Sequence, residues 1–246
     1  MDPKIEAVLE KIAREADEVL QDRLLSLYLY GSAVTGEYLP GRSDLNLLFL
    51  LRRVEVETLE ELQKPLRRWR KQGVGFPLIL DPEDLARSLD SFPLEFLEIK
   101  IAHRLLSGED QVSGLVIDPG ALRLQCEREI KGKLIQLQRG YLELGADRAG
   151  RETLFRESIK AVVIVMRAML WQEGVEPLPL PSGEVIAGIE AKLGQRLPHC
   201  RQALAFRAGR PRLAPTEAGA LFGGYLAEVK ELSGWIDRYS PRTAKP

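Results

Sequence analysis

The sequence predicts an α/β (α+β) amino-terminal domain with a small mixed sheet, followed by an all-α helical bundle. In the first half, segments of helical periodicity alternate with short apolar runs that are typical of strands. In the second half, apolar residues recur every three or four positions, and segments rich in glycine and proline separate these stripes. The change falls at Asp118-Pro119-Gly120, so we expect two domains, 1–118 and 119–246.

The first element is expected to be a helix. Asp2 is an N-cap residue, and Pro3 follows at the first helical position, where proline is favoured. The apolar residues that come next recur at helical spacing: Ile5, Val8, Ile12, Ala16 and Val19. A short apolar run from Leu24 to Tyr30 then indicates a β-strand, which ends at the Gly31-Ser32 pair.

A second strand is predicted from Asp44 to Leu51, after a polar connection punctuated by glycine and proline. Beyond its first residues the run is wholly apolar, which is typical of a strand buried on both faces. An amphipathic helix is expected next, and its apolar stripe consists of Leu59, Leu62, Leu66 and Trp69. Gly73 and Gly75 end that helix.

The rest of the first domain is expected to add a third strand and smaller elements. The third strand covers Phe76 to Leu80 and runs into Asp81-Pro82. Glu83 to Leu89 indicates a short helix, whereas Phe92 to Ile101 is apolar and fits either a helix or a strand. His103 to Ser107 is a candidate edge strand.

Four or five antiparallel helices are expected beyond residue 119, because amphipathic stripes there are joined by short connections. Three of the stripes are Ile130, Leu134, Leu137, Tyr141 and Leu144; Ile159, Val163, Met166 and Leu170; and Tyr225, Val229, Leu232 and Ile236. Ser182 is a candidate cap for a helix from Gly183 to Leu193, and Thr216 is a candidate cap for the last helix.

Composition excludes several classes of protein. The 246 residues are 45% hydrophobic and 29% charged, which indicates a globular chain without long disordered segments. Cys126 and Cys200 are too few for a disulfide scaffold, so we expect a reducing, cytoplasmic environment. The longest apolar stretch, Ala161 to Trp171, is short of the roughly 20 residues that a membrane span needs. No membrane partner is expected.

The charges are divided unevenly between the two halves. Residues 1–118 carry 15 Lys and Arg against 22 Asp and Glu, whereas residues 119–246 carry 20 against 14. Such an asymmetry fits an acidic metal-binding half beside a basic half that receives an anion, and it also fits chance. A candidate anion-binding cluster consists of Arg201, Arg207, Arg210 and Arg212. The near-balance over the whole chain argues against a nucleic-acid partner.

One constellation combines residues that bind phosphate and metal. A strand delivers Gly31-Ser32 at its end, and Asp44 opens the next strand. Because alternate side chains of a strand share a face, Asp44 and Asn46 point the same way. Glycine lets a backbone approach a triphosphate closely, and Ser32 with the neighbouring N–H groups could hold its oxygens. Arg42, on the same loop, is a candidate phosphate partner.

This order of a strand, Gly31-Ser32, a short helical turn and Asp44-Leu45-Asn46 opening a strand resembles the signature of a known superfamily. It is the nucleotidyltransferase superfamily related to DNA polymerase β, and especially its bacterial branch that includes the aminoglycoside nucleotidyltransferases. The segment from Phe92 to Asp110 resembles the region after the core in bacterial members, whose common companion is a carboxy-terminal helical bundle.

The resemblance implies Mg²⁺- or Mn²⁺-dependent transfer of a nucleoside monophosphate from a nucleoside triphosphate to a hydroxyl acceptor. In this family two metals clamp the in-line attack on the α-phosphate. Asp44 and Asn46 take the metal-binding and catalytic positions, and Asp81 is the best-placed candidate for the third carboxylate, ahead of Glu95 and Glu98. Asp81 could equally be the N-cap of the next helix.

Asn46 stands where the family pattern has a second carboxylate. An amide offers one oxygen to a hard cation but carries no negative charge and cannot bridge two metals. Two functions therefore remain open. One is nucleotidyl transfer to a small molecule or protein, and the other is a degenerate protein that acts as a nucleotide-binding or interaction module.

A third alternative, a toxin or antitoxin component with a helical RNase of the HEPN type, has less support. It requires Arg and His several residues apart on one helix, whereas Arg196 and His199 are close together and interrupted by Pro198. A homodimer formed through the helical bundle is compatible with each function.

Overall fold

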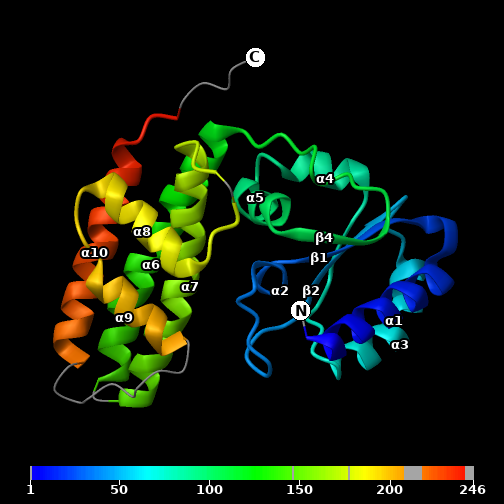
Figure 1. The fold of residues 1–246 in the computed structure, drawn as a ribbon, viewed down its shortest axis with the longest axis horizontal. Helices are drawn as coiled ribbons and strands as arrows, with labels where there is room; N and C mark the ends of the chain where they lie inside the picture. Colours follow the sequence, from blue (N-terminus) through cyan, green and yellow to red (C-terminus); the bar gives the residue numbers. More distant parts are fainter. Residues whose placement is uncertain (1, 146, 177, 208–217, 242–246) are drawn as a thin grey trace. The chain divides into compact units, whose positions relative to one another are not determined.

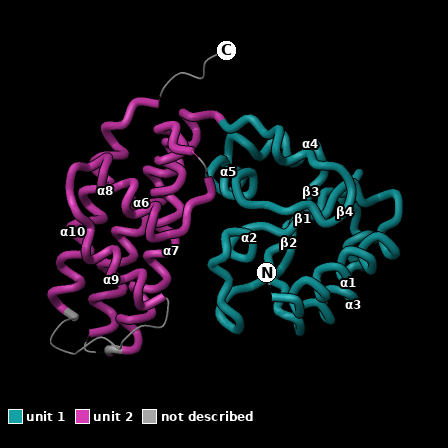
Figure 2. Tube along the Cα trace, in the orientation of Figure 1, with its two compact units in different colours: residues 1–117 teal, residues 118–246 magenta. Residues whose placement is uncertain are grey.

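The computed structural model describes residues 2–145, 147–176, 178–207 and 218–241. The chain divides into two compact units, residues 1–117 and 118–246 (Figure 2). The first holds a four-stranded sheet with helices, and the described part of the second is helical. The predicted fold class, a small mixed sheet followed by a helical bundle, is confirmed (Figure 1).

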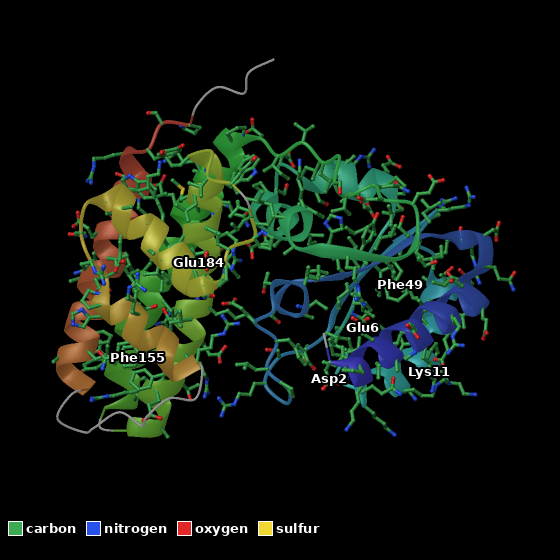
Figure 3. The ribbon with its side chains drawn as sticks, in the orientation of Figure 1. Asp2, Glu6, Lys11, Phe49, Phe155 and Glu184 are labelled. Atoms are coloured by element: carbon green, nitrogen blue, oxygen red, sulfur yellow. The ribbon has the colours of Figure 1, made fainter. Side chains whose placement is uncertain are left out.

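The first unit begins with helix α1 (Pro3–Leu20), which starts where the sequence predicted. The Asp2 carboxylate accepts a hydrogen bond from the Lys4 N–H at 2.8 Å, so Asp2 satisfies one of the free amides at the helix start. Asp2 lies at the beginning of α1 in Figure 3. The helix turns an apolar stripe to the core: Leu9, Ile12, Ala13, Ala16 and Leu20.

The sheet has the order β3-β2-β1-β4. Its strands are β1 (Leu24–Tyr30), β2 (Asn46–Leu51), β3 (Leu78–Leu80) and β4 (His103–Gly108). β1 pairs antiparallel with β2 and with β4, whereas β2 pairs parallel with β3, so the sheet is mixed. β4 lies at an edge, as predicted, and β2 is buried along almost its whole length.

The third strand is shorter than the sequence predicted. Leu45 bridges Val74, while Leu48 pairs with Leu78, so the β3 side has one extra residue between the two pairings. Such a bulge interrupts the ladder and turns a side chain outward. Phe76 lies in this stretch and is 73% exposed, with the Arg70 guanidinium stacked 4.0 Å from its ring centroid.

Helices α1 and α3 (Val56–Arg70) cover one face of the sheet (Figure 1). Trp69 of α3 stacks on Phe49 of β2, with ring centroids 6.0 Å apart, and its Nε1 donates to the Glu15 carboxylate of α1 at 2.8 Å. This hydrogen bond, with that from Arg68, outweighs burial and lowers the pKa of Glu15. One tryptophan thus joins both helices to the sheet.

The other face of the sheet is covered by the chain after β4. Ser26 and Tyr28 donate from their hydroxyls to the Glu109 carbonyl at 2.6 and 3.0 Å, and Gln111 N–H donates to the Tyr28 hydroxyl at 2.8 Å. Helix α4 (Pro82–Ser88) and helix α5 (Pro93–Ile101) precede this segment. The segment that fitted either a helix or a strand is therefore helical, with Pro93 in its first turn.

Five helices make up the described part of the second unit. They are α6 (Pro119–Leu144), α7 (Arg148–Gln172), α8 (Ser182–Leu193), α9 (Pro198–Arg207) and α10 (Ala218–Arg238). Phe155 is fully buried among them (Figure 3). Ser182 is the first residue of α8 and Pro181 is its N-cap, so Ser182 does not cap this helix. Thr216 lies outside the described residues. Within the described ranges, no helix is both long and apolar enough to cross a membrane.

Two buried carboxylates from neighbouring helices hold the start of α9. Glu190 of α8 accepts from the Leu197 N–H at 2.8 Å and from two guanidinium nitrogens of Arg201 at 3.0 and 2.6 Å. Glu228 of α10 accepts from the N–H groups of His199 and Cys200. Mainly because of Arg201, the pKa of Glu190 is lowered to about 2.

Acid should therefore destabilise the second unit through Glu190. A carboxyl whose pKa is lowered by folding stabilises the protein above its unfolded pKa and loses that contribution as pH falls toward the folded pKa. We expect Glu190 to contribute about 3 kcal/mol to the free energy of unfolding at neutral pH, and to lose it between about pH 5 and about pH 2.

Urea unfolding of the wild type and Glu190→Gln across this pH range measures the effect. The stability of the variant should fall less steeply with acid than that of the wild type. If the free energy of unfolding fell equally steeply with acid in both proteins, Glu190 would not be the group responsible.

Candidate functional site

Three chain segments meet at one end of the sheet. The antiparallel register pairs Tyr30, the last residue of β1, with Asn46, the first residue of β2. Gly31 therefore follows β1 directly beside Asn46. Gly75 approaches from the other side, because its N–H donates to the Leu45 carbonyl at 3.1 Å. The site thus has a glycine on each side of Asn46.

Gly31 has a backbone conformation that requires glycine. Its φ of 78° and ψ of -142° lie in a region that residues with a Cβ rarely enter. Its N–H donates to the Ala102 carbonyl at 3.0 Å, so the turn is tied to the end of α5. Ser32 then begins the one-turn helix α2 (Ser32–Thr35), whose first N–H groups have no acceptor within the helix.

The amide of Asn46 is oriented by its two glycine neighbours. A Cβ placed on Gly31 would lie 3.1 Å from Asn46 Nδ2, so the amide nitrogen faces this turn. A Cβ placed on Gly75 would lie 3.5 Å from Asn46 Oδ1 and 3.3 Å from Asp44 Cβ. The amide oxygen and the Asp44 side chain therefore lie around the same small residue, Gly75, where a side chain would crowd them.

This arrangement provides two oxygen ligands of the kind that hard divalent cations prefer. The Asp44 side chain is exposed, and Asn46 is half-buried. A carboxylate and an amide oxygen bind Mg²⁺ or Mn²⁺ well, usually with waters and substrate phosphates completing the shell. Across the described residues, no three His, Cys, Asp or Glu side chains are close enough together to hold a metal ion by themselves. A cation at this site would need oxygens from its ligand.

The loop between α2 and β2 folds into a turn of its own before it reaches Asp44. Ser43 N–H and Arg42 N–H both donate to the Leu39 carbonyl, at 2.8 and 3.0 Å. Tyr38 of this loop packs partly buried against the core, and its hydroxyl lies 3.4 Å from where a Cβ on Gly73 would be. Arg42 is exposed two residues before Asp44.

Asp81 is not brought together with Asp44 and Asn46. β2 and β3 are parallel and Leu80 pairs with Leu50, so Asp81 lies beyond the last pair, at the opposite end of β2 from Asn46. Five residues of strand correspond to about 16 Å. The Asp81 carboxylate accepts from the Asp84 N–H at 2.8 Å and caps α4, which is the alternative that the sequence left open.

The proposed basic cluster of the second half is only partly described. Arg201 is bound by Glu190, so its charge serves the packing of α8 against α9. Arg207 is the last residue of α9. Arg210 and Arg212 lie outside the described residues.

Sequence reasoning missed two contributors to the site, Gly75 and Ala102. In the sequence Gly75 is typical of a helix terminator, and Ala102 has no polar side chain. Two glycines flanking one apolar residue, at Gly73 and Gly75, were the available signal for a close approach of the backbone. The contribution of Ala102 is its carbonyl, which no sequence pattern could indicate.

Comparison with known proteins agrees with this geometry at the level of the fold. No protein-family model and no curated protein matches the sequence. The structure is similar to the crystal structure of spectinomycin adenyltransferase from Enterococcus faecialis with ATP and spectinomycin. The TM-score is 0.54 at 12% sequence identity, and the match covers 92% of this chain and 99% of the other. The chain therefore has a nucleotidyltransferase-like fold, as the sequence resemblance implied.

Gly31→Ala should disturb the site more than Gly36→Ala, although both glycines have φ near 78°. Gly36 has ψ of 8° and nothing within 4 Å of its added Cβ, so alanine there should cost about 1 kcal/mol. Alanine at Gly31 enters a region that only glycine favours and meets the Asn46 amide, so we expect about 3 kcal/mol.

Urea unfolding measures the loss of stability in both variants. The NMR signals of the Asn46 side-chain amide report changes in its surroundings. Those signals should shift in Gly31→Ala and stay in place in Gly36→Ala. Equal shifts in both variants would argue against close contact between Gly31 and Asn46.

Proposed function

We propose that this protein binds a nucleoside triphosphate together with one divalent cation, Mg²⁺ or Mn²⁺, at the end of β1 and the start of β2. The observation that carries the proposal is that the Asp44 side chain and Asn46 Oδ1 both lie beside Gly75, while Asn46 Nδ2 faces the glycine turn at Gly31. A carboxylate and an amide oxygen close to a glycine turn form a combination suited to a metal-bound triphosphate.

Each residue of the site has a distinct role in this proposal. Gly31 lets the backbone approach the phosphates, and the Ser32 hydroxyl and N–H donate to phosphate oxygens. Asp44 and the amide oxygen of Asn46 bind the cation, which also binds the phosphates. Arg42, exposed on the preceding turn, adds its positive charge to that of the cation and attracts the phosphates.

The metal ligands at the site favour nucleotide binding over rapid catalysis. Two-metal phosphoryl transfer needs carboxylates that neutralise and bridge both cations. Asp44 supplies one negative charge, Asn46 supplies none, and Asp81 caps α4 at the other end of β2. A single cation that arrives with the triphosphate fits these groups.

Asp44→Asn should weaken binding of Mg²⁺·ATP, because it removes the negative charge from the cation site while keeping the shape. We expect a loss of at least about tenfold in affinity, or roughly 1.4 kcal/mol, measured by isothermal titration calorimetry. Asp81→Asn is the matched control and should bind as the wild type does. Equal affinities for the wild type and Asp44→Asn would contradict the proposed cation site, as would an absence of binding to the wild type.

A second candidate function is nucleotidyl transfer, and the extent of the structural likeness favours it. The match to the adenyltransferase extends over 92% of this chain, so it includes helices of the second unit as well as the sheet. In this reaction an acceptor hydroxyl on a small molecule or protein forms a bond to the α-phosphorus. The bond to pyrophosphate breaks, and the hydroxyl proton passes to a base.

Asn46→Asp distinguishes the two functions. The change adds the second carboxylate beside Asp44 with almost no change in side-chain volume. If the protein is a lapsed catalyst, pyrophosphate release from ATP with Mg²⁺ should rise by at least about tenfold in Asn46→Asp, over a panel of hydroxyl acceptors. If the wild type already releases pyrophosphate and the variant releases less, Asn46 is an adapted ligand of an active enzyme.

A further inference from the structure

The glycine turn is supported by the corner between α5 and β4. Ala102 ends α5, because its N–H donates to the carbonyls of Glu98 and Ile99 at 3.1 and 3.3 Å. The carbonyl of the same residue accepts from Gly31 N–H at 3.0 Å. The position of the corner therefore sets the position of the turn at which we propose that phosphates bind.

His103 is the residue whose side chain closes this corner. Its Nδ1 lies 3.0 Å from the Ile99 carbonyl and 3.1 Å from the Lys100 carbonyl, both in the last turn of α5. Its backbone pairs with Tyr30, and its ring meets Tyr28 edge-on at 5.6 Å. One side chain thus joins the end of the helix to the start of the strand.

Both ring nitrogens of His103 face oxygen atoms. Nδ1 faces two carbonyl oxygens, which can only accept. Nε2 lies 3.4 Å from Ser113 Oγ and 3.6 Å from an Asp110 carboxylate oxygen. The Ser113 hydroxyl donates its proton to the other oxygen of Asp110, so it offers Nε2 a lone pair. The Nδ1 side of the ring therefore contacts the end of α5, and the Nε2 side contacts the segment after β4.

Asp110 is the carboxylate that faces Nε2. Burial raises its pKa, but hydrogen bonds from Ser113 and Val112 and the charge of His103 together bring the pKa below its usual value. The other ionisable groups around the ring are neutral or directed elsewhere. Burial raises the pKa of Tyr30, the Tyr28 hydroxyl donates to Glu109, and the Lys100 ammonium donates to the Leu115 carbonyl.

We propose that His103 is a positioning residue whose ring closes the α5–β4 corner and thereby orients Gly31 for the triphosphate. The inference rests on the nucleotide-binding function proposed above. Without this ring the end of α5 is no longer tied to the start of β4, so the corner loosens and affinity for the nucleotide falls.

Two measurements test the inference. The first is hydrogen exchange at the Gly31 amide, which needs no ligand. The second is the affinity for Mg²⁺·ATP. His103→Ala removes the contacts with the carbonyls of α5, whereas His103→Gln keeps an amide that can donate to them. His199→Ala is the matched control, because His199 also contacts a carboxylate, Glu228 at 2.6 Å, but belongs to the second unit.

In His103→Ala, protection of Gly31 and affinity should both be at least about fivefold lower than in the wild type and His199→Ala. His103→Gln should restore part of both. Unchanged protection of Gly31 in His103→Ala would overturn the inference. Normal exchange behaviour without any ATP binding would overturn the proposed function and leave the corner intact.

Discussion

The pairing of β1 with β2 is the constraint on which the first unit depends. The register that sets Tyr30 opposite Asn46 also sets Leu27 opposite Phe49 and Leu29 opposite Leu47. These four apolar side chains lie in the core beneath α1 and α3. A slip of one residue in either strand would turn its two side chains away from that core. The energy of burying them therefore holds Gly31 beside Asn46.

The same register explains why the site is poor in negative charge. Asn46 occupies the position closest to the glycine turn, and Gly75 occupies the neighbouring position toward β3. Asp44 lies two residues before Asn46 and is exposed. With one carboxylate at the turn, the energy of attracting a cation must come in part from the phosphates that accompany it.

The second unit uses carboxylates for packing. Glu190 and Glu228 come from two different helices and both accept from backbone amides at the start of α9. Glu190 also binds Arg201, and Glu228 also binds His199. Buried charges that are paired in this way fix how three helices meet, because an unpaired charge left in the core would be costly. A positive net charge on this half therefore does not by itself indicate an anion site.

Local patterns in the sequence were enough for most of the fold and for part of the site. The cap at Asp2, the stripes of α1 and α3, and the buried run of β2 result from spacing and side-chain type, which act over a few residues. Gly31, Ser32, Asp44 and Asn46 could be named as candidates because they flank two such strands. The shortening of β3 was not predictable, because it results from a bulge between pairings with β2.

The sequence by itself determined which side chains are available: one aspartate, one asparagine and a glycine turn. Only the tertiary structure decided which of them meet. Asp81 and Gly75 lie on the same segment after α3, yet the parallel register places Gly75 against Asp44 and carries Asp81 about 16 Å along the sheet. Contacts between residues far apart in the chain depend on strand register and on backbone carbonyls such as that of Ala102. Neither leaves a local pattern of side chains, because both arise when the strands and helices pack.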